Sequence, residues 1–391
     1  MDGVEVSVTA TDVPPVTPRP SLRAFLPGAL RSSLVPWLVA RALVGAALLV
    51  GHELVTHHHL TGAAAARVHQ GLLGWDAGWY QSIAGHGYAG AGPSSLRFFP
   101  LLPLVARALS VLPGISVGAA VVVVANISAL IGTALMVVLV RLESGDDRLA
   151  RRSAWLICLA PAAFTFVMGY AEGTLLALAV GCFLALRTRH WGFAALLGMA
   201  AGLTRPLGAL LLVPAAVEAW RDWRGAAAGE RLARSAAVAG PVVGAGAFLG
   251  WVAWRYGDGL APLRLQEQAG HHGRLVDPLV TLAHDASYLV HGHHLGEALH
   301  LPWVLVVLAL LVVSFRSWPA SYGWFSAAVV VLALTGSNLD SFERYALSAF
   351  PLILAVGTLT AGRWVRRVVL LLFGSAMFGY ALLAFANRYV P

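Results

Sequence analysis

The chain has 391 residues, of which 58% are hydrophobic and only 12% are charged. About a quarter of the residues in soluble domains are charged, so the composition excludes an ordinary soluble protein and predicts an integral membrane protein. The net charge of +8 is attributed to arginines beside membrane helices. No base-stacking motif accompanies these arginines, so we expect no nucleic-acid partner.

Residues 1–32 are rich in proline and polar side chains. A removable signal peptide would need a short apolar core followed by a small-residue cleavage site, and the N-terminus shows neither. We therefore predict a disordered cytoplasmic tail over residues 1–32, followed by a single transmembrane domain over residues 33–391.

Eleven apolar runs follow this tail. A membrane span needs about 20 residues, at about 1.5 Å each, to cross about 30 Å of hydrocarbon. The predicted fold class is an all-α polytopic membrane protein with about 11 transmembrane helices. The runs cover residues 34–55, 117–140, 154–169, 173–187, 191–203, 207–220, 236–256, 301–315, 321–336, 345–361 and 367–387.

The runs between residues 154 and 220 are short, and the alternative is that they fuse into two long helices, 154–187 and 191–220. Fusion would place Glu172 and Arg205 near the bilayer centre, at a cost of about 2.5 to 3.5 kcal/mol each. We therefore predict four short passes, whose turns YAEG and TRPLG lie on one face of the membrane.

Residues 98–112 lie in the proline-containing stretch RFFPLLPLVARALSVLPG. The prolines favour a surface or re-entrant helix, and an ordinary short span is the alternative. If this stretch does not cross and the N-terminus is cytoplasmic, the arginine-rich segments 141–152, 187–189, 221–234, 316 and 363–367 all lie inside, as the positive-inside rule requires.

Two external loops follow from this topology, in what we expect to be a multi-pass plasma-membrane protein. Residues 56–116 form the first and carry interfacial helices, and residues 257–300 form a second, rich in histidine. The unusual polar motifs of the chain then share the extracytoplasmic face. Polar groups at the edge of membrane helices are candidates for a functional site, so we expect the active site there.

Asp76, in the stretch LLGWDAGWYQSIAGHGY, is the predicted catalytic base. Trp75, Trp79 and Tyr80 suit the headgroup level because their rings are apolar and their tips polar. We predict that these three residues and His86 bind substrate. The alternative for Asp76 is a helix cap at the start of an interfacial helix.

Glu172 follows Tyr170 at a turn between helices, where we predict a second catalytic carboxylate and a substrate-binding tyrosine. Its alternative role is to face the positive end of the next helix dipole. Arg205 and Arg344, with Tyr345, are predicted to bind a phosphate. The alternatives are an ion pair with Glu172 for Arg205 and an interfacial anchor for Arg344.

The histidines at 57–59 and in the loop 257–300 show no ordered metal-ligand spacing. We expect no cofactor, and a divalent metal ion is the alternative. Cys158 and Cys182 lie in apolar runs and are predicted to be packing residues.

WDAGWYQSIAGHGY followed by FFPLLPLVARAL resembles the signature of the PIG-V-like mannosyltransferases, the family of the enzyme that adds the second mannose to glycosylphosphatidylinositol. NISALIGTALMVVLVRL, APAAFTFVMGYAEGTLLALAVG, GLTRPLGALLLVP and ERYALSAFPLILAVG continue the resemblance in order, from about residue 70 to 360. All 27 basic residues are arginine, which indicates a GC-rich bacterial gene and favours an actinobacterial member.

The resemblance implies a GT-C glycosyltransferase whose active site faces away from the cytoplasm and whose donor is polyprenyl-phosphate-mannose. It implies that the essential acid of the first external loop is Asp76. We expect the FFPLLP segment, with Phe99, to contact substrate at the entrance of an apolar groove. The expected reaction is inverting transfer of mannose to a hydroxyl of a lipid or protein acceptor, among membrane lipids.

Two other functions remain open at this point. A transporter or flippase of a lipid-linked sugar would also need an apolar groove and arginines within the membrane. The chain, however, shows no two-fold internal repeat of the kind that many secondary transporters carry. A non-catalytic membrane scaffold is favoured only if Asp76, Glu172, Arg205 and Arg344 lie far apart.

Overall fold

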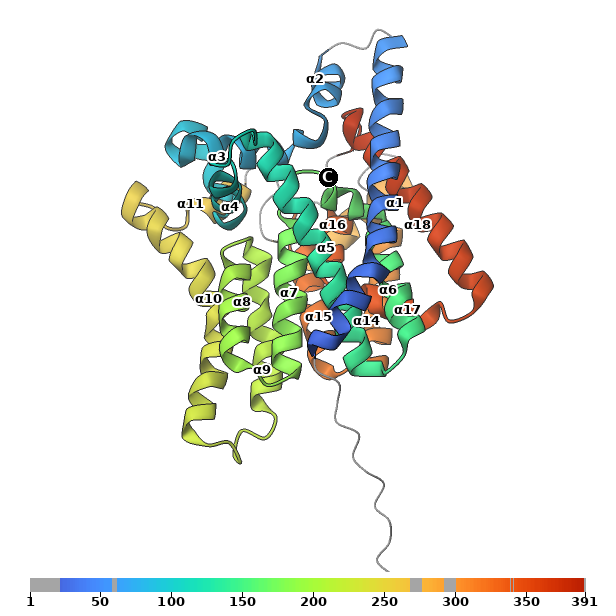
Figure 1. The fold of residues 1–391 in the computed structure, drawn as a ribbon. Coiled ribbons are helices and arrows are strands. Elements are labelled where there is room, and N and C mark those ends of the chain that lie inside the picture. Colours follow the sequence, from blue (N-terminus) through green and yellow to red (C-terminus); the bar gives the residue numbers. More distant parts are fainter. Residues whose placement is uncertain are drawn as a thin grey trace, which may run out of the picture.

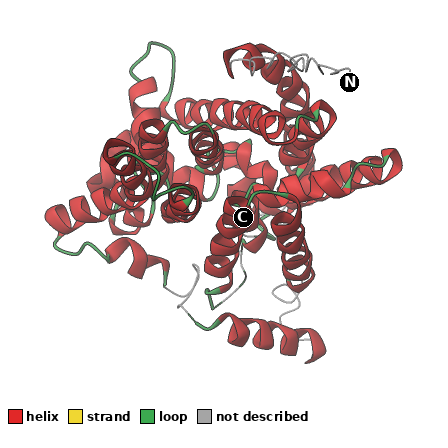
Figure 2. Cartoon of the chain, turned by 90° about the horizontal axis from the view of Figure 1, so that it is seen from below, coloured by secondary structure: helices red, strands yellow, loops and turns green. Residues whose placement is uncertain are grey.

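The computed structural model describes residues 22–57, 62–267, 276–291, 300–337, 339 and 341–389. Its described residues form helices and contain no strand (Figure 2). This confirms the all-α class. Cys158 and Cys182 are buried and form no disulfide, as expected of packing residues.

Four helices are long and apolar enough to cross a membrane: α1 (Leu22–His57), α5 (Val117–Ser144), α10 (Ala228–Tyr256) and α18 (Arg363–Phe385). A fifth crossing is possible if α16 (Phe342–Ser348) and α17 (Pro351–Leu359), which meet at an angle of 87°, form one broken span. Helix length thus supports four or five spans, and the predicted number of about 11 is not confirmed.

The remaining helices of the bundle are shorter and pack among the long ones (Figure 1). Several are apolar, but none alone covers about 30 Å of hydrocarbon. They are α6 (Asp147–Leu159), α7 (Glu172–Arg187), α8 (Trp191–Gly202), α9 (Leu212–Trp220), α14 (Leu301–Ser317) and α15 (Ala320–Leu334).

Helices α6 to α9 are separate, as predicted, and do not fuse into two long helices. The breaks within this region are the 3₁₀ segments η3 (Pro161–Phe166) and η4 (Pro206–Leu211). Each begins with a proline, which lacks a backbone N–H and disfavours helix at the residue before it. The two turns that carry Glu172 and Arg205 follow η3 and precede η4.

Helix α7 packs against α5. Its first residues lie beside the interior of α5, well past the first residue of that helix. A Cβ atom at Gly173 would come within 2.5 Å of the carbonyl oxygen of Ala125, so glycine is required for this close approach. Ala125 is eight residues after Val117, the first residue of α5, which corresponds to about 12 Å along the helix. The start of α7 is therefore recessed into the bundle.

Short helices cover this end of the bundle (Figure 1). The segment predicted to be the first external loop contains α2 (Ala63–Gln70), η1 (Gly71–Leu73), α3 (Asp76–Ala91), η2 (Pro93–Arg97) and α4 (Leu101–Leu109). The nine-residue α4 is only about 14 Å long, and the surface or re-entrant placement of this segment stays a prediction. The predicted second loop contains α11 (Ala261–Gln266) and α12 (Pro278–His291).

The N-terminal region differs from the prediction of a tail over residues 1–32. Helix α1 already begins at Leu22, so residues 22–32 are helical. Pro27 and Pro36 both lie within this helix and do not end it. Residues 1–21 of the predicted tail lie outside the described part of the chain.

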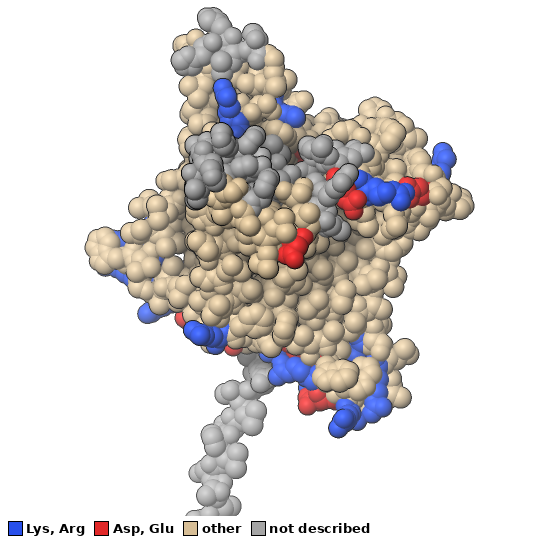
Figure 3. All heavy atoms as spheres, turned by 180° about the vertical axis from the view of Figure 1, so that it is seen from behind, with Lys and Arg blue, Asp and Glu red and all other residues tan. Residues whose placement is uncertain are grey.

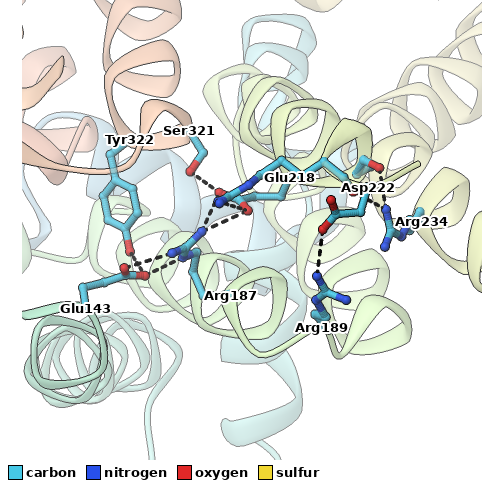
Figure 4. Close-up of polar contacts among 10 residues, drawn as sticks. Glu143, Arg187, Arg189, Glu218, Asp222, Arg234, Ser321 and Tyr322 are labelled. Carbon is cyan, nitrogen blue, oxygen red and sulfur yellow. Dashed lines mark hydrogen bonds and ion pairs between the residues drawn. The ribbon is translucent and has the colours of Figure 1, made fainter. Parts of the chain in front are cut away.

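The opposite end of the bundle holds a network of ion pairs between helix ends (Figure 4). Arg187 at the end of α7 bonds to Glu143 of α5 and to Glu218 of α9. Glu218 also accepts a hydrogen bond of 2.6 Å from the Ser321 hydroxyl of α15, and Tyr322 donates to Glu143. On the face drawn in Figure 3, many charged side chains gather along this end of the molecule.

We expect Glu218→Gln to lower the free energy of unfolding by about 3 to 5 kcal/mol, because Glu218 is buried and its loss leaves the half-buried Arg187 with only part of its counter-charge. The exposed Arg189–Asp222 pair at the same end serves as a control. Asp222→Asn should cost about 1 kcal/mol or less. Thermal unfolding in detergent measures both variants, and equal losses would contradict a stabilising role for the buried network.

Candidate active site

Four charged residues predicted from the sequence meet at the recessed end of the bundle. Arg344 of α16 places Nη1 2.7 Å from Oδ2 of Asp76, the first residue of α3. Its Nε lies 3.4 Å from Oε1 of Glu172, the first residue of α7. Arg205, directly before η4, forms an ion pair with the same Glu172 oxygen. Four segments that are distant in the sequence thus build one cluster, Asp76–Arg344–Glu172–Arg205.

The cluster is buried at one side and open at the other. The exposed side-chain fractions are 2% for Glu172, 8% for Arg344, 11% for Arg205 and 28% for Asp76. Oδ2 of Asp76 is held by Arg344, whereas Oδ1 has no hydrogen-bond partner among the described residues. The most exposed side chain of the cluster is therefore that of Asp76.

The backbone around Asp76 is held in place from two sides. Trp75 has a left-handed φ of 57°, which is uncommon for a bulky residue and indicates strain that the surrounding structure must offset. Its indole Nε1 donates a 3.0 Å hydrogen bond to the carbonyl of Ala384, near the end of α18. The backbone N–H of Asp76 donates a weak 3.4 Å bond to the hydroxyl of Tyr170.

Two tyrosines line the guanidinium groups of the cluster. The ring of Tyr345 lies 5.6 Å from the guanidinium carbon of Arg205 and 5.7 Å from that of Arg344, and Tyr170 lies 5.6 Å from Arg344. Aromatic faces attract cations at such distances. Burial holds the pKa of Tyr170 well above its usual value, so its hydroxyl keeps its proton.

The turn before Glu172 is fixed by two polar side chains from within the long helices. Asn126 of α5 donates to the carbonyl of Val167 at 2.8 Å, and Arg41 of α1 donates to the carbonyl of Phe166 at 3.0 Å. Arg41 also donates to the side-chain oxygen of Asn126 at 2.8 Å. These contacts satisfy carbonyls that the break after η3 leaves without helical partners, and they position the segment leading to Glu172.

Glu343, next to Arg344, is buried in a separate network. One oxygen lies 2.8 Å from Nδ1 of His300 and accepts a hydrogen bond from Tyr380, and the other accepts one from Tyr389. These contacts tie α16 to α14 and α18 and thereby hold Arg344 against Asp76. The sequence did not predict a role for Glu343, because its partners lie 37 to 46 positions away in the chain.

The other predicted substrate-binding residues are placed differently. Trp79 is partly exposed and stacks on Phe98 at 5.8 Å, and Tyr80 is buried beneath Phe98. Phe99 is buried against Phe248 of α10 at 4.7 Å, so its ring fills a core instead of lining the open side of the cluster. His86 is exposed ten residues after Asp76, about 15 Å along α3.

Among the described residues, no group of three or more His, Cys, Asp or Glu side chains is arranged to hold a metal ion. Several histidines of the predicted loops, at 58, 59, 271, 272, 293 and 294, lie outside the described part of the chain.

One protein-family model matches part of the chain. Residues 31–210 match the family model described as mannosyltransferase (PIG-V). The match contains Asp76, Glu172 and Arg205 and ends before Arg344. No curated protein matches the chain.

Proposed function

We propose, from the premise that this chain belongs to the PIG-V-like mannosyltransferase family, that it transfers mannose from polyprenyl-phosphate-mannose to an acceptor hydroxyl. The reaction would proceed on the extracytoplasmic face of the plasma membrane, with the N-terminus in the cytoplasm. The acceptor would be a glycolipid or a protein. No cofactor is needed for the chemistry proposed.

One observation carries the proposal: the partly exposed carboxylate of Asp76 is in direct contact with the buried guanidinium of Arg344. A glycosyl transfer of this type needs a base for the acceptor and positive charge for the departing phosphate. The cluster contains both, and Glu172 and Arg205 extend it into the bundle.

The proposed mechanism is a single displacement with inversion at the anomeric carbon. Oδ1 of Asp76 takes the proton of the acceptor hydroxyl as the hydroxyl oxygen attacks, and the bond between the anomeric carbon and the phosphate oxygen breaks. Negative charge gathers on the departing polyprenyl phosphate. Arg344 and Arg205, with Tyr345 beside them, would stabilise this charge most strongly in the transition state, where it is increasing.

Arg344 can serve both partners because a guanidinium has five N–H donors in a fixed plane. Its contact with Asp76 uses Nη1, which leaves other donors for a phosphate oxygen. Glu172 would act by orienting the two guanidinium groups and, when they move to the phosphate, by contacting the acceptor.

We further propose a GT-C arrangement of about 11 passes, in which short helices cross together with the broken segments beside them. For example, the predicted pass over residues 154–169 contains the apolar end of α6 followed by all of η3. The apolar space between helices would hold the polyprenyl chain.

The experiment that tests the proposed function is a transfer assay with purified protein in lipid nanodiscs. Polyprenyl-phosphate-mannose is mixed with candidate acceptors, and both free polyprenyl phosphate and mannosylated product are measured. Equal amounts of the two are expected. Movement of intact donor across a sealed vesicle membrane, without its consumption, would instead support the transporter or flippase.

We expect Arg205→Ala to raise the KM for the donor by about tenfold, as expected for loss of a charge-assisted contact to phosphate. The KM for the acceptor should change little, because Arg205 is paired with Glu172 and not with Asp76, the proposed base for the acceptor. Steady-state kinetics with each substrate varied in turn makes the comparison. Equal losses for both substrates would mean that Arg205 only holds Glu172 in place.

A further inference from the structure

Arg97, the last residue of η2, lies beside the proposed active site. Its guanidinium carbon is 4.8 Å from the ring centre of Phe98 and 5.6 Å from that of Trp79. Trp79 is three residues after Asp76 on α3, so it lies on the same helix face, about one turn away. The two rings hold the guanidinium on the side of α3 that carries Asp76.

Arg97 differs from the other arginines of the site in its lack of a counter-charge. Arg344 and Arg205 are each paired with a carboxylate. Arg97 forms no ion pair and no hydrogen bond within the described part of the chain, although its Nε is buried. Burial lowers the pKa of Arg97, and the charge of Asp76 opposes this effect, which indicates that the two groups interact electrostatically.

The charge of Arg97 is therefore not balanced by a direct ion pair. Arg205 and Arg344 are paired with the carboxylates Glu172 and Asp76, whereas Arg97 has no carboxylate partner among the described residues. A buried donor without a partner and a partly desolvated cation both cost free energy until an anion arrives. The stacking on two rings orients the guanidinium plane before binding, which reduces the entropy lost on contact.

We propose that Arg97 is a further phosphate-binding residue, which holds the phosphate of the lipid-linked donor at the open side of the cluster. The inference rests on the proposed function for the identity of the lipid. In this proposal, the unpaired positive charge of Arg97 attracts the phosphate first. Arg344 and Arg205, already paired with carboxylates, would engage the phosphate afterwards.

The test measures how tightly the full chain in nanodiscs binds two lipids. One is polyprenyl phosphate, and the other is polyprenol, which has the same tail without the phosphate. Arg97→Gln should weaken binding of polyprenyl phosphate by about tenfold, the effect of one charge-assisted contact, and leave polyprenol unchanged. Arg97→Lys, which keeps the charge but loses the planar fork, should recover part of the affinity. Arg107→Gln removes an exposed arginine of α4 as the control and should bind both lipids normally.

Two results would overturn the inference. Unchanged affinity of Arg97→Gln for polyprenyl phosphate would mean that the stacked guanidinium is only a packing element. Equal weakening for polyprenol would mean that the variant disturbs the tail groove. Because the assay needs no acceptor and no turnover, it is independent of the transfer assay. If the wild-type chain transfers mannose and Arg97→Gln binds polyprenyl phosphate normally, the inference about Arg97 is refuted and the proposed function is not.

Discussion

Replacing Asp76 by asparagine should lower the rate of mannose transfer by about 10² to 10⁴-fold, the contribution expected of a positioned general base. Asparagine has nearly the same shape and its side-chain oxygen can still accept the hydrogen bond from Arg344. The change therefore removes proton transfer and leaves most of the geometry. Single-turnover measurements with saturating donor report the loss directly.

The control for this variant is Asp222→Asn, which makes the same chemical change at an exposed residue of the opposite end. It should transfer mannose at the wild-type rate. Donor binding should be retained in Asp76→Asn, since the guanidinium groups that face the phosphate remain. A variant that transfers mannose at near the wild-type rate would rule out Asp76 as the base.

Arg344→Gln is expected to lower kcat by about 10² to 10³-fold, as seen when one preorganised donor to a developing negative charge is removed. Arg344 touches both carboxylates of the site, so its loss also leaves the buried Glu172 with Arg205 as its one remaining ion-pair partner among the described residues. Arg344→Lys keeps the charge but not the two-sided contact, and should recover only part of the activity.

A double-mutant cycle separates catalysis from folding at this pair. If Asp76 and Arg344 act as a unit, the double variant Asp76→Asn with Arg344→Gln should lose much less than the product of the single losses. Strictly multiplicative losses would mean that the 2.7 Å contact has no role in turnover. Thermal unfolding of each protein in the cycle shows whether stability accounts for any change.

The charged residues of the cluster could be predicted from the sequence because charges are rare in this chain. Glu172 and Arg205 each stand at a break between apolar runs, and a carboxylate or guanidinium at such a place is costly unless it has a function or a partner. The predicted alternative for Arg205, an ion pair with Glu172, is also found.

The contact between Asp76 and Arg344 could not be predicted in the same way. The two residues are 268 positions apart, and their meeting depends on the bend of 87° after α16 and on the network around Glu343. Local patterns do not contain this information. Arg97 was overlooked for a related reason, since only the folded loop shows that it stacks beside Asp76's helix.

Neighbours within one motif can also point to different places. Phe98 and Phe99 are adjacent, yet Phe98 contacts Trp79 and Phe99 packs against Phe248 of α10. His86 shares a motif with Asp76 but lies three turns further along α3. A resemblance in sequence identifies such a motif as a whole, whereas the direction of each side chain depends on helix phase and on later helices.

The recessed start of α7 bears on a competing reaction, the loss of the sugar to solvent. Glu172 lies about 12 Å below the end of α5, beneath the short helices of the first loop. A displacement at this depth would meet few water molecules, because apolar helices surround it and the acceptor fills the open side. Under the proposed function, the recessed position of Glu172 would thus limit hydrolysis of the lipid-linked mannose.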